Sequence, residues 1–271
     1  MTQFNIDNII DDIAEKGIDQ GQAKKGPDKL PEGNAFFRIF AYLEYGKQVT
    51  EYKGDRKERH RMRIGLEVSG KNYPPIQTES GPMPRTIWLQ ELTLSQDDRA
   101  GSYKLFQQLS KGSKVKHFAQ LLGNRAAFMG EIKHSEDGKY VNVLLNTLRP
   151  AYAEAVNDDG ELVRTPIKVQ ELRTPEMLFV WDFATPAMWD SIHIAGEYKA
   201  KLDAEGNIVR AAESRNIHQA KILKALNFDT LPCAAYAKGS ISRAAEEAVG
   251  AAVGEVDSPP AADEDEDGIP Y

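Results

Sequence analysis

Residues 36–45 read Phe36-Phe37-Arg38-Ile39-Phe40-Ala41-Tyr42-Leu43-Glu44-Tyr45. Successive side chains of a strand point to opposite faces, so an apolar face is predicted from Phe37, Ile39, Ala41 and Leu43. The opposite face would combine a guanidinium with aromatic rings, on Arg38, Phe40 and Tyr42. Such side chains pair with phosphates and stack on nucleic-acid bases. The stretch therefore predicts a strand with a core on one side and a candidate nucleic-acid surface on the other.

The next apolar stretch repeats this alternation. Its inward positions would be Met62, Ile64, Leu66 and Val68, and its outward positions would include Arg59, Arg61 and Arg63. Between the two strands, Gly46 to Arg59 is predicted to be a mobile basic loop around Gly54. The loop's candidate nucleic-acid ligands are Tyr52, Lys53, Arg56 and Lys57. Six bases against two acids between Lys53 and Arg63 leave a positive surplus that cross-strand pairing cannot neutralise.

The following segments complete a pattern of three strands, a helix and two strands. A third strand is expected over Thr86 to Leu94, which contains Trp88, and helical spacing follows over Ser102 to Leu109 and Lys114 to Leu122. A last hairpin is expected from Arg125 to His134 and from Lys139 to Leu148, because Asp137-Gly138 is a strong hairpin turn signal. The predicted fold is mainly β with added helices (α+β), built on a five-stranded oligonucleotide-binding (OB) barrel.

Charge is distributed unevenly along the 271 residues. The formal net charge is −7, yet residues 24–149 contain 22 Lys and Arg against 14 Asp and Glu, a net of +8. Residues 240–271 contain nine acids and one base. A basic body attracts phosphate backbones because neutralising them releases counterions. The acidic tail could fold back onto that body and compete with a nucleic acid.

The chain ends in five consecutive carboxylates followed by a glycine and a short apolar segment: Asp263, Glu264, Asp265, Glu266, Asp267, Gly268, Ile269, Pro270 and Tyr271. A run of like charges cannot bury enough apolar surface to fold, so disorder is expected from about Ser240. Ile269 and Tyr271 beside a terminal carboxylate instead suggest a segment that another protein binds. A merely solubilising tail is the alternative interpretation.

The tail resembles the C-terminus of bacterial and phage single-stranded DNA-binding proteins. In the bacterial proteins an acidic run ends Asp-Asp-Asp-Ile-Pro-Phe, whereas here Gly268 is inserted and Tyr271 replaces phenylalanine. The segments Leu178 to Phe183 and Ser214 to Phe228 also look similar to those that follow the barrel in phage single-stranded DNA-binding proteins. The resemblance implies an OB barrel, coating of single-stranded DNA in phage DNA replication, recombination and repair, and recruitment of replication or repair proteins by Asp263 to Tyr271.

Four regions are expected along the chain. Residues 1–31 form an arm with a short helix striped by Ile6, Ile9, Ile10 and Ile13, residues 32–150 the DNA-binding barrel, residues 151–239 a mixed α/β extension packed on it, and residues 240–271 the tail. The arm is a candidate for self-association. One cysteine, no apolar run of membrane-spanning length and no signal peptide indicate a protein that stays in the cytoplasm, here of an infected bacterium.

Other interpretations remain open. Phe40 and Tyr42 could be covered by residues 150–239 instead of binding bases. Trp88 shares its strand face with Gln90, Leu92 and Leu94 and could pack in the core. Glu131-Ile132-Lys133 has the spacing of metal-dependent nucleases, with Lys133 otherwise a DNA ligand, but no acidic partner is identifiable upstream. No metal spacing or cofactor motif is present, so neither an enzyme nor a cofactor is expected. A virion structural or adaptor protein would explain the tail but not the basic strand face.

Overall fold

The computed structural model describes residues 29–52, 55–78, 81–202 and 208–240. The chain divides after Leu30 into two units, and the described residues from Pro31 onward belong to the second. Predictions for the arm helix, for Lys53 and for the tail with Asp263 to Asp267, Ile269, Pro270 and Tyr271 therefore lie outside the described residues.

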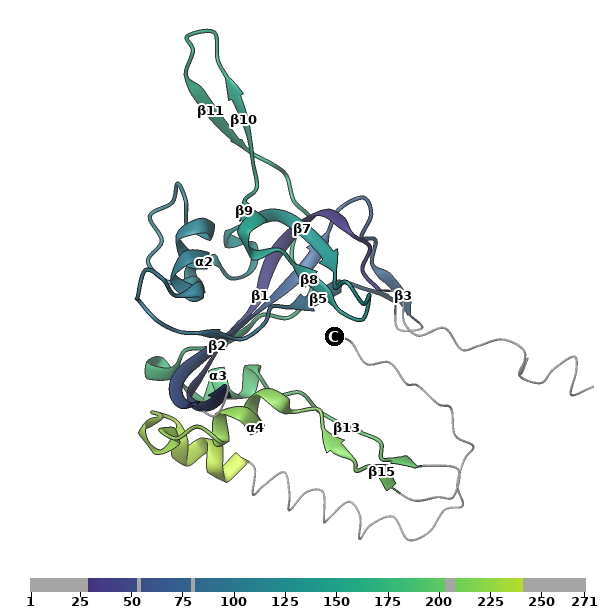
Figure 1. Cartoon of the computed structure of the whole chain (residues 1–271), viewed down its shortest axis with the longest axis vertical. Coiled ribbons are helices and arrows are strands. Elements are labelled where there is room, and N and C mark those ends of the chain that lie inside the picture. The colour runs from purple at the N-terminus through teal and green to yellow at the C-terminus, as the bar shows by residue number, and fades with distance from the viewer. Residues whose placement is uncertain (1–28, 53–54, 79–80, 203–207, 241–271) are drawn as a thin grey trace, which may run out of the picture. The chain divides into compact units, whose positions relative to one another are not determined.

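A long antiparallel hairpin forms the centre of the fold (Figure 1). Its strands are β1 (Gly33–Tyr52) and β2 (Asp55–Ser69). The main sheet has the order β5-β2-β1-β7-β8, with β5 (Arg85–Trp88), β7 (Phe128–His134) and β8 (Val141–Val143). Three short strands pair alongside: β6 (Leu92–Thr93) on β2, β9 (Arg149–Pro150) on β7, and β12 (Met177–Phe179) parallel to β1. Within the described residues the sheet is open, since no pairing joins β8 to β5.

Two bulges allow β1 to remain paired with β2 over its whole length while the strand bends. The register shifts between Ile39 and Ala41 and again between Glu44 and Lys47. At the second bulge Gly46 has a φ of 69°, which favours glycine, and an added Cβ would lie 2.3 Å from the Trp181 ring. A glycine is thus required here both by the backbone angle and by the tryptophan packed on it.

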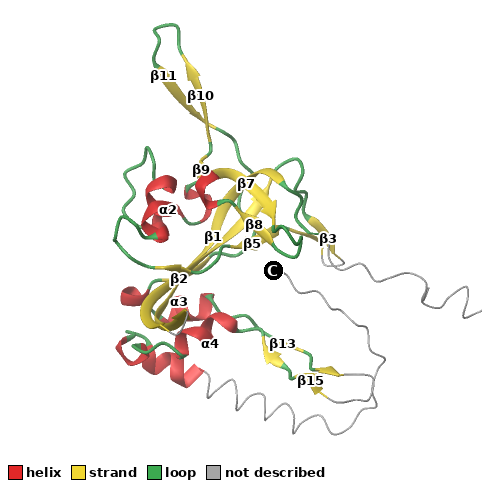
Figure 2. Ribbon diagram, viewed as in Figure 1, coloured by secondary structure: helices red, strands yellow, loops and turns green. Residues whose placement is uncertain are grey.

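Besides the main sheet, the structure contains helices, short 3-10 turns and separate two-stranded sheets (Figure 2). The helices are α2 (Gly101–Leu109), α3 (Pro186–Ser191) and α4 (Ile217–Leu223), followed by helical residues 234–240. Short 3-10 turns are η1 (Phe118–Leu121), η2 (Gly123–Arg125), η3 (Leu145–Thr147), η4 (Trp181–Phe183) and η5 (Phe228–Thr230). The separate two-stranded sheets are β3 (Ile76–Thr78) with β4 (Gly81–Met83), β10 (Tyr152–Val156) with β11 (Leu162–Pro166), β13 (Glu197–Tyr198) with β16 (Glu213–Ser214), and β14 (Lys201–Leu202) with β15 (Ile208–Arg210).

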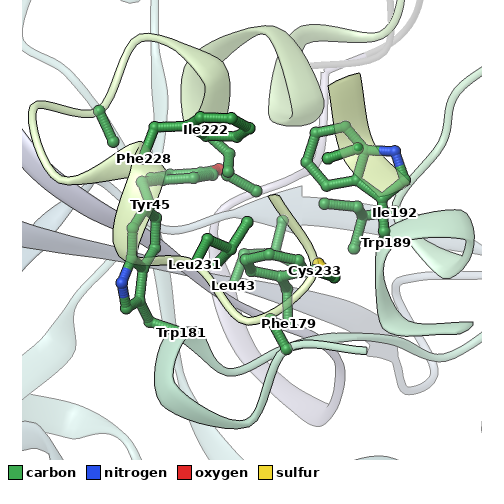
Figure 3. Close-up of a cluster of buried hydrophobic side chains, with 13 residues drawn as sticks. Leu43, Tyr45, Phe179, Trp181, Trp189, Ile192, Ile222, Phe228, Leu231 and Cys233 are labelled. Atoms are coloured by element: carbon green, nitrogen blue, oxygen red, sulfur yellow. The ribbon is translucent and has the colours of Figure 1, made fainter. Parts of the chain in front are cut away.

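The segments after β12 share a hydrophobic core with β1 (Figure 3). Leu43 and Tyr45 of β1 pack with Phe179, Trp189 and other apolar side chains from residues 179–237, all buried. Apolar burial of this kind is the main favourable term in folding. Residues 179–192 and 222–237 are consequently held against the far half of β1 by a continuous apolar cluster.

The sequence predictions for the fold have mixed outcomes. The mainly β architecture with added helices is confirmed, as are α2 and the β7–β8 hairpin around Gly138, whose φ is 65°. The predicted mobile loop from Gly46 to Arg59 is wrong. The described residues of this range, 46–52 and 55–59, extend both strands, and their pairing continues to Tyr52 and Asp55, because Gly46 forms a bulge instead of ending the strand.

Candidate nucleic-acid interface

Four cations occupy alternate positions on β2, and their exposure falls along the strand. Lys57 and Arg59 are exposed at the far end of the hairpin, opposite Thr50 and Gln48 of β1. In the described part of the chain neither cationic side chain has a hydrogen bond or an ion pair. Together with Thr50 and Asp55 they line a hollow of about 230 Å³. Both charges therefore face water and can exchange it for phosphate at little cost. Lys57, Arg59, Arg61 and Arg63 together form the β2 cation row.

Arg61 and Arg63 are the half-buried members of the β2 cation row. Arg61 donates from Nη1 to Thr93 Oγ1 at 3.0 Å and from Nη2 to the carbonyl of Glu91 at 2.9 Å. Its Nε lies 3.7 Å from Glu91 Oε2. Arg63 donates from Nε to the carbonyl of Leu89 at 3.1 Å, and its guanidinium lies 5.2 Å from the centre of the Trp88 ring. The predicted outward face exists, but these two guanidinium groups already have protein partners.

Trp88 takes part in an aromatic cluster between the sheet and α4. Its ring lies 5.1 Å from Phe40 in an edge-to-face contact and 4.7 Å from His218 of α4. Trp88 is half-buried, and it also packs against the apolar cluster that joins the C-terminal segments to β1. The structure thus brings Trp88 of β5 beside Arg63 at the buried end of the β2 cation row. Because the two residues lie on different strands, the alternation of side chains within each strand did not predict this pair.

Among the residues predicted to contact nucleic acid, Phe40 and Tyr42 are buried and Arg38 is half-buried with protein partners. Phe40 is 4% exposed and Tyr42 is 0% exposed. The Tyr42 ring stacks on Phe118 of η1 at 5.5 Å. The Arg38 guanidinium donates hydrogen bonds to the carbonyls of Gln170 (2.6 Å), Ala126 (3.0 Å) and Val169 (3.2 Å). In this conformation other segments cover Phe40 and Tyr42 and hold the Arg38 guanidinium, so DNA contacts by these three residues would require that face of β1 to be uncovered.

The remaining predicted ligands lie apart from the β2 cation row or cannot be placed. Arg56 is exposed but pairs in register with Glu51, one position out of phase with Lys57 and Arg59. Lys133 is exposed on β7, and its Nζ lies 3.9 Å from Glu131 Oε1. Tyr52 ends β1, while its side chain lies outside the described residues, as do Lys53 and the tail. Only Lys57, Arg59, Arg61, Arg63 and Trp88 are brought together.

Glu44 is a buried carboxylate that ties β1 to its covering segments. It accepts hydrogen bonds from the Tyr42 hydroxyl at 2.7 Å and from the backbone N–H of Trp181 at 2.8 Å, and His117 Nε2 lies 3.7 Å away. Burial alone would raise the pKa of Glu44, but its interactions with His117, Tyr42 and Trp181 outweigh burial and lower it. Burial and the Glu44 charge raise the pKa of Tyr42, which keeps it a hydrogen-bond donor.

His218 of α4 packs against Tyr45 and Trp88, beside Arg63 at the buried end of the β2 cation row. A 2.8 Å hydrogen bond joins its Nδ1 to the Tyr45 hydroxyl, while its buried Nε2 has no partner in the described structure. Burial, with the charges of Arg63 and Lys221 opposed by Glu91, lowers the pKa of His218 to about 4. The imidazole is therefore neutral at pH 7, which avoids a further positive charge beside Arg63.

Sequence reasoning missed the residues that neutralise the inner half of the β2 cation row. Glu91 pairs with both Arg61 and Lys221, which reaches it from α4. Lys221 also lies 5.1 Å from the Tyr45 ring. Glu91 lies in a stretch predicted to be a strand, and its charge is visible in the sequence. Its partners Arg61 and Lys221 are 30 and 130 residues away along the chain, which the sequence does not show. Only the fold brings them together.

Other site types find little support in the described residues. In the ranges that the structure covers, no group of three or more His, Cys, Asp or Glu side chains could hold a metal ion. None of the helices in those ranges has both the length and the apolar character needed to cross a bilayer. Comparison of the chain with protein-family models, with curated proteins and with solved structures finds no match.

Proposed function

We propose that this chain binds single-stranded DNA without sequence preference, as a phage-type single-stranded DNA-binding protein acting in replication, recombination and repair. The observation that carries the proposal is the pair of exposed cations Lys57 and Arg59, whose side chains have no partner among the described residues, and which continues into Arg61, Arg63 and the half-buried Trp88. Cations that follow a backbone, together with a ring that can stack a base, are the two requirements of sequence-independent single-strand binding.

We infer that the main sheet is a partly open OB barrel. In support, β1, β2 and β5 come first along the chain, α2 follows, and β7 and β8 come last, which is the expected order of three strands, a helix and two strands. In such folds oligonucleotides bind across one face and the adjoining loops. Here the covered face of β1 leaves the far end of the β1–β2 hairpin as the accessible part of that surface.

The acidic tail is proposed to recruit replication or repair proteins through Ile269, Pro270 and Tyr271, and to compete with DNA through Asp263 to Asp267. The protein is proposed to act as a binding module without catalysis, in the cytoplasm of an infected bacterium. This division of roles follows from the charge separation between residues 24–149 and residues 240–271.

Salt titration of oligo(dT) binding tests the proposal. Each phosphate contact to a single strand contributes about 0.7 to the slope of log affinity against log salt. The double variant Lys57→Ala/Arg59→Ala should therefore flatten that slope by about 1.4. The control Arg99→Ala/Lys139→Ala removes the same charge from residues paired locally with Asp97 and Asp137, and it should keep the wild-type slope.

An affinity for oligo(dT) that does not depend on salt would contradict the electrostatic account. Repeating the titration in EDTA and in Mg²⁺ distinguishes the alternatives. Cleavage that requires Mg²⁺ would favour a nuclease, and no binding at moderate salt would favour a structural or adaptor protein. Deleting Asp263 to Tyr271 should tighten binding at low salt, whereas an unchanged affinity would rule out competition by the tail.

A further inference from the structure

A second basic cavity lies where the β10–β11 hairpin leaves the main sheet. It measures about 460 Å³ and is lined by Lys111, Arg149, Pro150, Tyr152, Glu154 and Arg164. The lining comes from three separate segments: the loop after α2, strands β9 and β10, and strand β11. Figure 1 shows this hairpin projecting from the sheet next to β9. The β2 cation row contributes none of these residues, so this cavity is a distinct feature.

Two of the cations that line this cavity have no protein partner. In the described residues the side chains of Lys111 and Arg149 form neither a hydrogen bond nor an ion pair, and both are exposed. The third cation, Arg164, donates from Nε to Glu154 Oε1 at 2.9 Å across the hairpin. Three bases against one acid give the cavity a net charge of about +2, which favours an anion.

The cavity also has an aromatic wall. Tyr152 is 39% exposed on β10, in register with Pro166 of β11. The backbone of Arg149 pairs with Met129 of β7, so this side of the cavity is anchored to the main sheet. A simple anion such as phosphate would bind the cations but make no contact that requires the Tyr152 ring. A nucleotide uses both, because its phosphate pairs with the cations while its base stacks on the ring.

We propose that this cavity binds one nucleotide of a single DNA strand, with the backbone phosphate between Arg149 and Lys111 and the base against Tyr152. The inference rests on the proposed function and adds a contact outside the β2 cation row. Its volume lies in the range of about 300–1,000 Å³ that pockets for small ligands occupy. In this assignment Glu154 restrains Arg164 and weakens binding, because the carboxylate competes with the phosphate for the same guanidinium.

Fluorescence anisotropy with labelled oligo(dT) over a range of salt concentrations tests the assignment. Lys111→Ala/Arg149→Ala removes both cations from the one bound phosphate and should flatten the salt slope by about 0.7, the contribution of one lost phosphate contact. Tyr152→Ala should weaken binding about 5- to 150-fold with an unchanged slope, as expected for loss of one stacked base, whereas Tyr152→Phe should bind like the wild type. Glu154→Gln should bind more tightly and steepen the slope by up to about 0.7.

The outcomes separate this inference from the proposed function. If the wild type binds oligo(dT) but these variants match the control Arg99→Ala/Lys139→Ala in affinity and slope, the cavity is not a nucleotide site and the proposed function stands. Weaker binding by Glu154→Gln would also overturn the assignment. If the wild type does not bind oligo(dT) at all, the proposed function fails first. Thermal unfolding of each variant confirms that the exposed substitutions leave the fold intact.

Discussion

Acid should weaken the attachment of the C-terminal segments to the sheet, because His218 is held neutral at that contact. The pKa of this imidazole falls from 6.5 to about 4, through burial first and then through the charges of Arg63 and Lys221, opposed by Glu91. Between these two pH values the unfolded chain binds a proton that the folded chain excludes. The free energy of unfolding therefore falls as the pH falls through this window.

The size of the effect follows from the two pKa values. A full shift from 6.5 to about 4 corresponds to about 3 kcal/mol, at about 1.4 kcal/mol for each pKa unit. Between pH 7 and pH 5, where only part of the shift is expressed, the expected loss from His218 is about 2 kcal/mol. Staying above pH 5 also keeps buried carboxylates such as Glu44, whose pKa is lowered, from contributing to the loss.

Urea unfolding at pH 7, 6 and 5, followed by tryptophan fluorescence, measures this loss. Trp181 and Trp189 lie in the apolar cluster that joins the C-terminal segments to β1, so their emission reports on that contact. His218→Phe removes the titrating group and should flatten the pH dependence by about 2 kcal/mol, although losing the Tyr45 hydrogen bond lowers its stability at pH 7. His60→Gln, a half-buried histidine elsewhere on β2, serves as the control. A wild-type stability that is equal at pH 7 and pH 5, or an equal loss in His218→Phe, would refute the reasoning.

Three further substitutions test the packing around the site by urea unfolding. Gly46→Ala should cost about 2 kcal/mol or more, since its Cβ meets the Trp181 ring at 2.3 Å, while Gly239→Ala, with no atom within 4 Å, should be neutral or stabilising. Arg38→Ala leaves three carbonyls without a donor and should cost about 2–3 kcal/mol while keeping the wild-type salt slope for oligo(dT). A flatter salt slope for Arg38→Ala would instead indicate that Arg38 contacts DNA. Glu67→Gln should cost about 2 kcal/mol, because its carboxylate accepts hydrogen bonds from residues 173–174, and a neutral result would contradict that role.

The strand periodicity predicted the inner faces of β1 and β2 because side-chain alternation is a local property of the backbone. Phe37, Ile39, Met62 and Ile64 are all buried as expected. The outer face of β1 was misinterpreted for a physical reason. An aromatic residue at an outward position stacks equally well on a base or on another part of the same chain, and Phe118, some 75 residues away from Tyr42, is such a partner. Local sequence does not distinguish the two.

The error over Gly46 to Arg59 has a different origin. Gly46 and Gly54 are typical signals of a loop, and the charges between them suggested a solvated one. Cross-strand pairing from Lys47 to Tyr52 nevertheless continues, because a bulge absorbs Gly46 and Trp181 packs onto it. The stabilising partner comes from 135 positions further along the chain. Likewise, the basic cavity beside β10 combines residues from three segments, which no single stretch of sequence identifies.

We expect the two halves of the β2 cation row to contribute differently to DNA binding. Arg61 and Arg63 would have to exchange protein partners for a phosphate and gain little, whereas Lys57 and Arg59 exchange only water and counterions. The acidic tail, if it competes with DNA, should act on Lys57 and Arg59, the two cations of the row without a partner among the described residues. Deleting Asp263 to Tyr271 and neutralising Lys57 and Arg59 should then be non-additive: the deletion tightens oligo(dT) binding in the wild type but has a much smaller effect in Lys57→Ala/Arg59→Ala. Additive effects in this double-mutant cycle, measured at low salt, would place the tail elsewhere on the basic body.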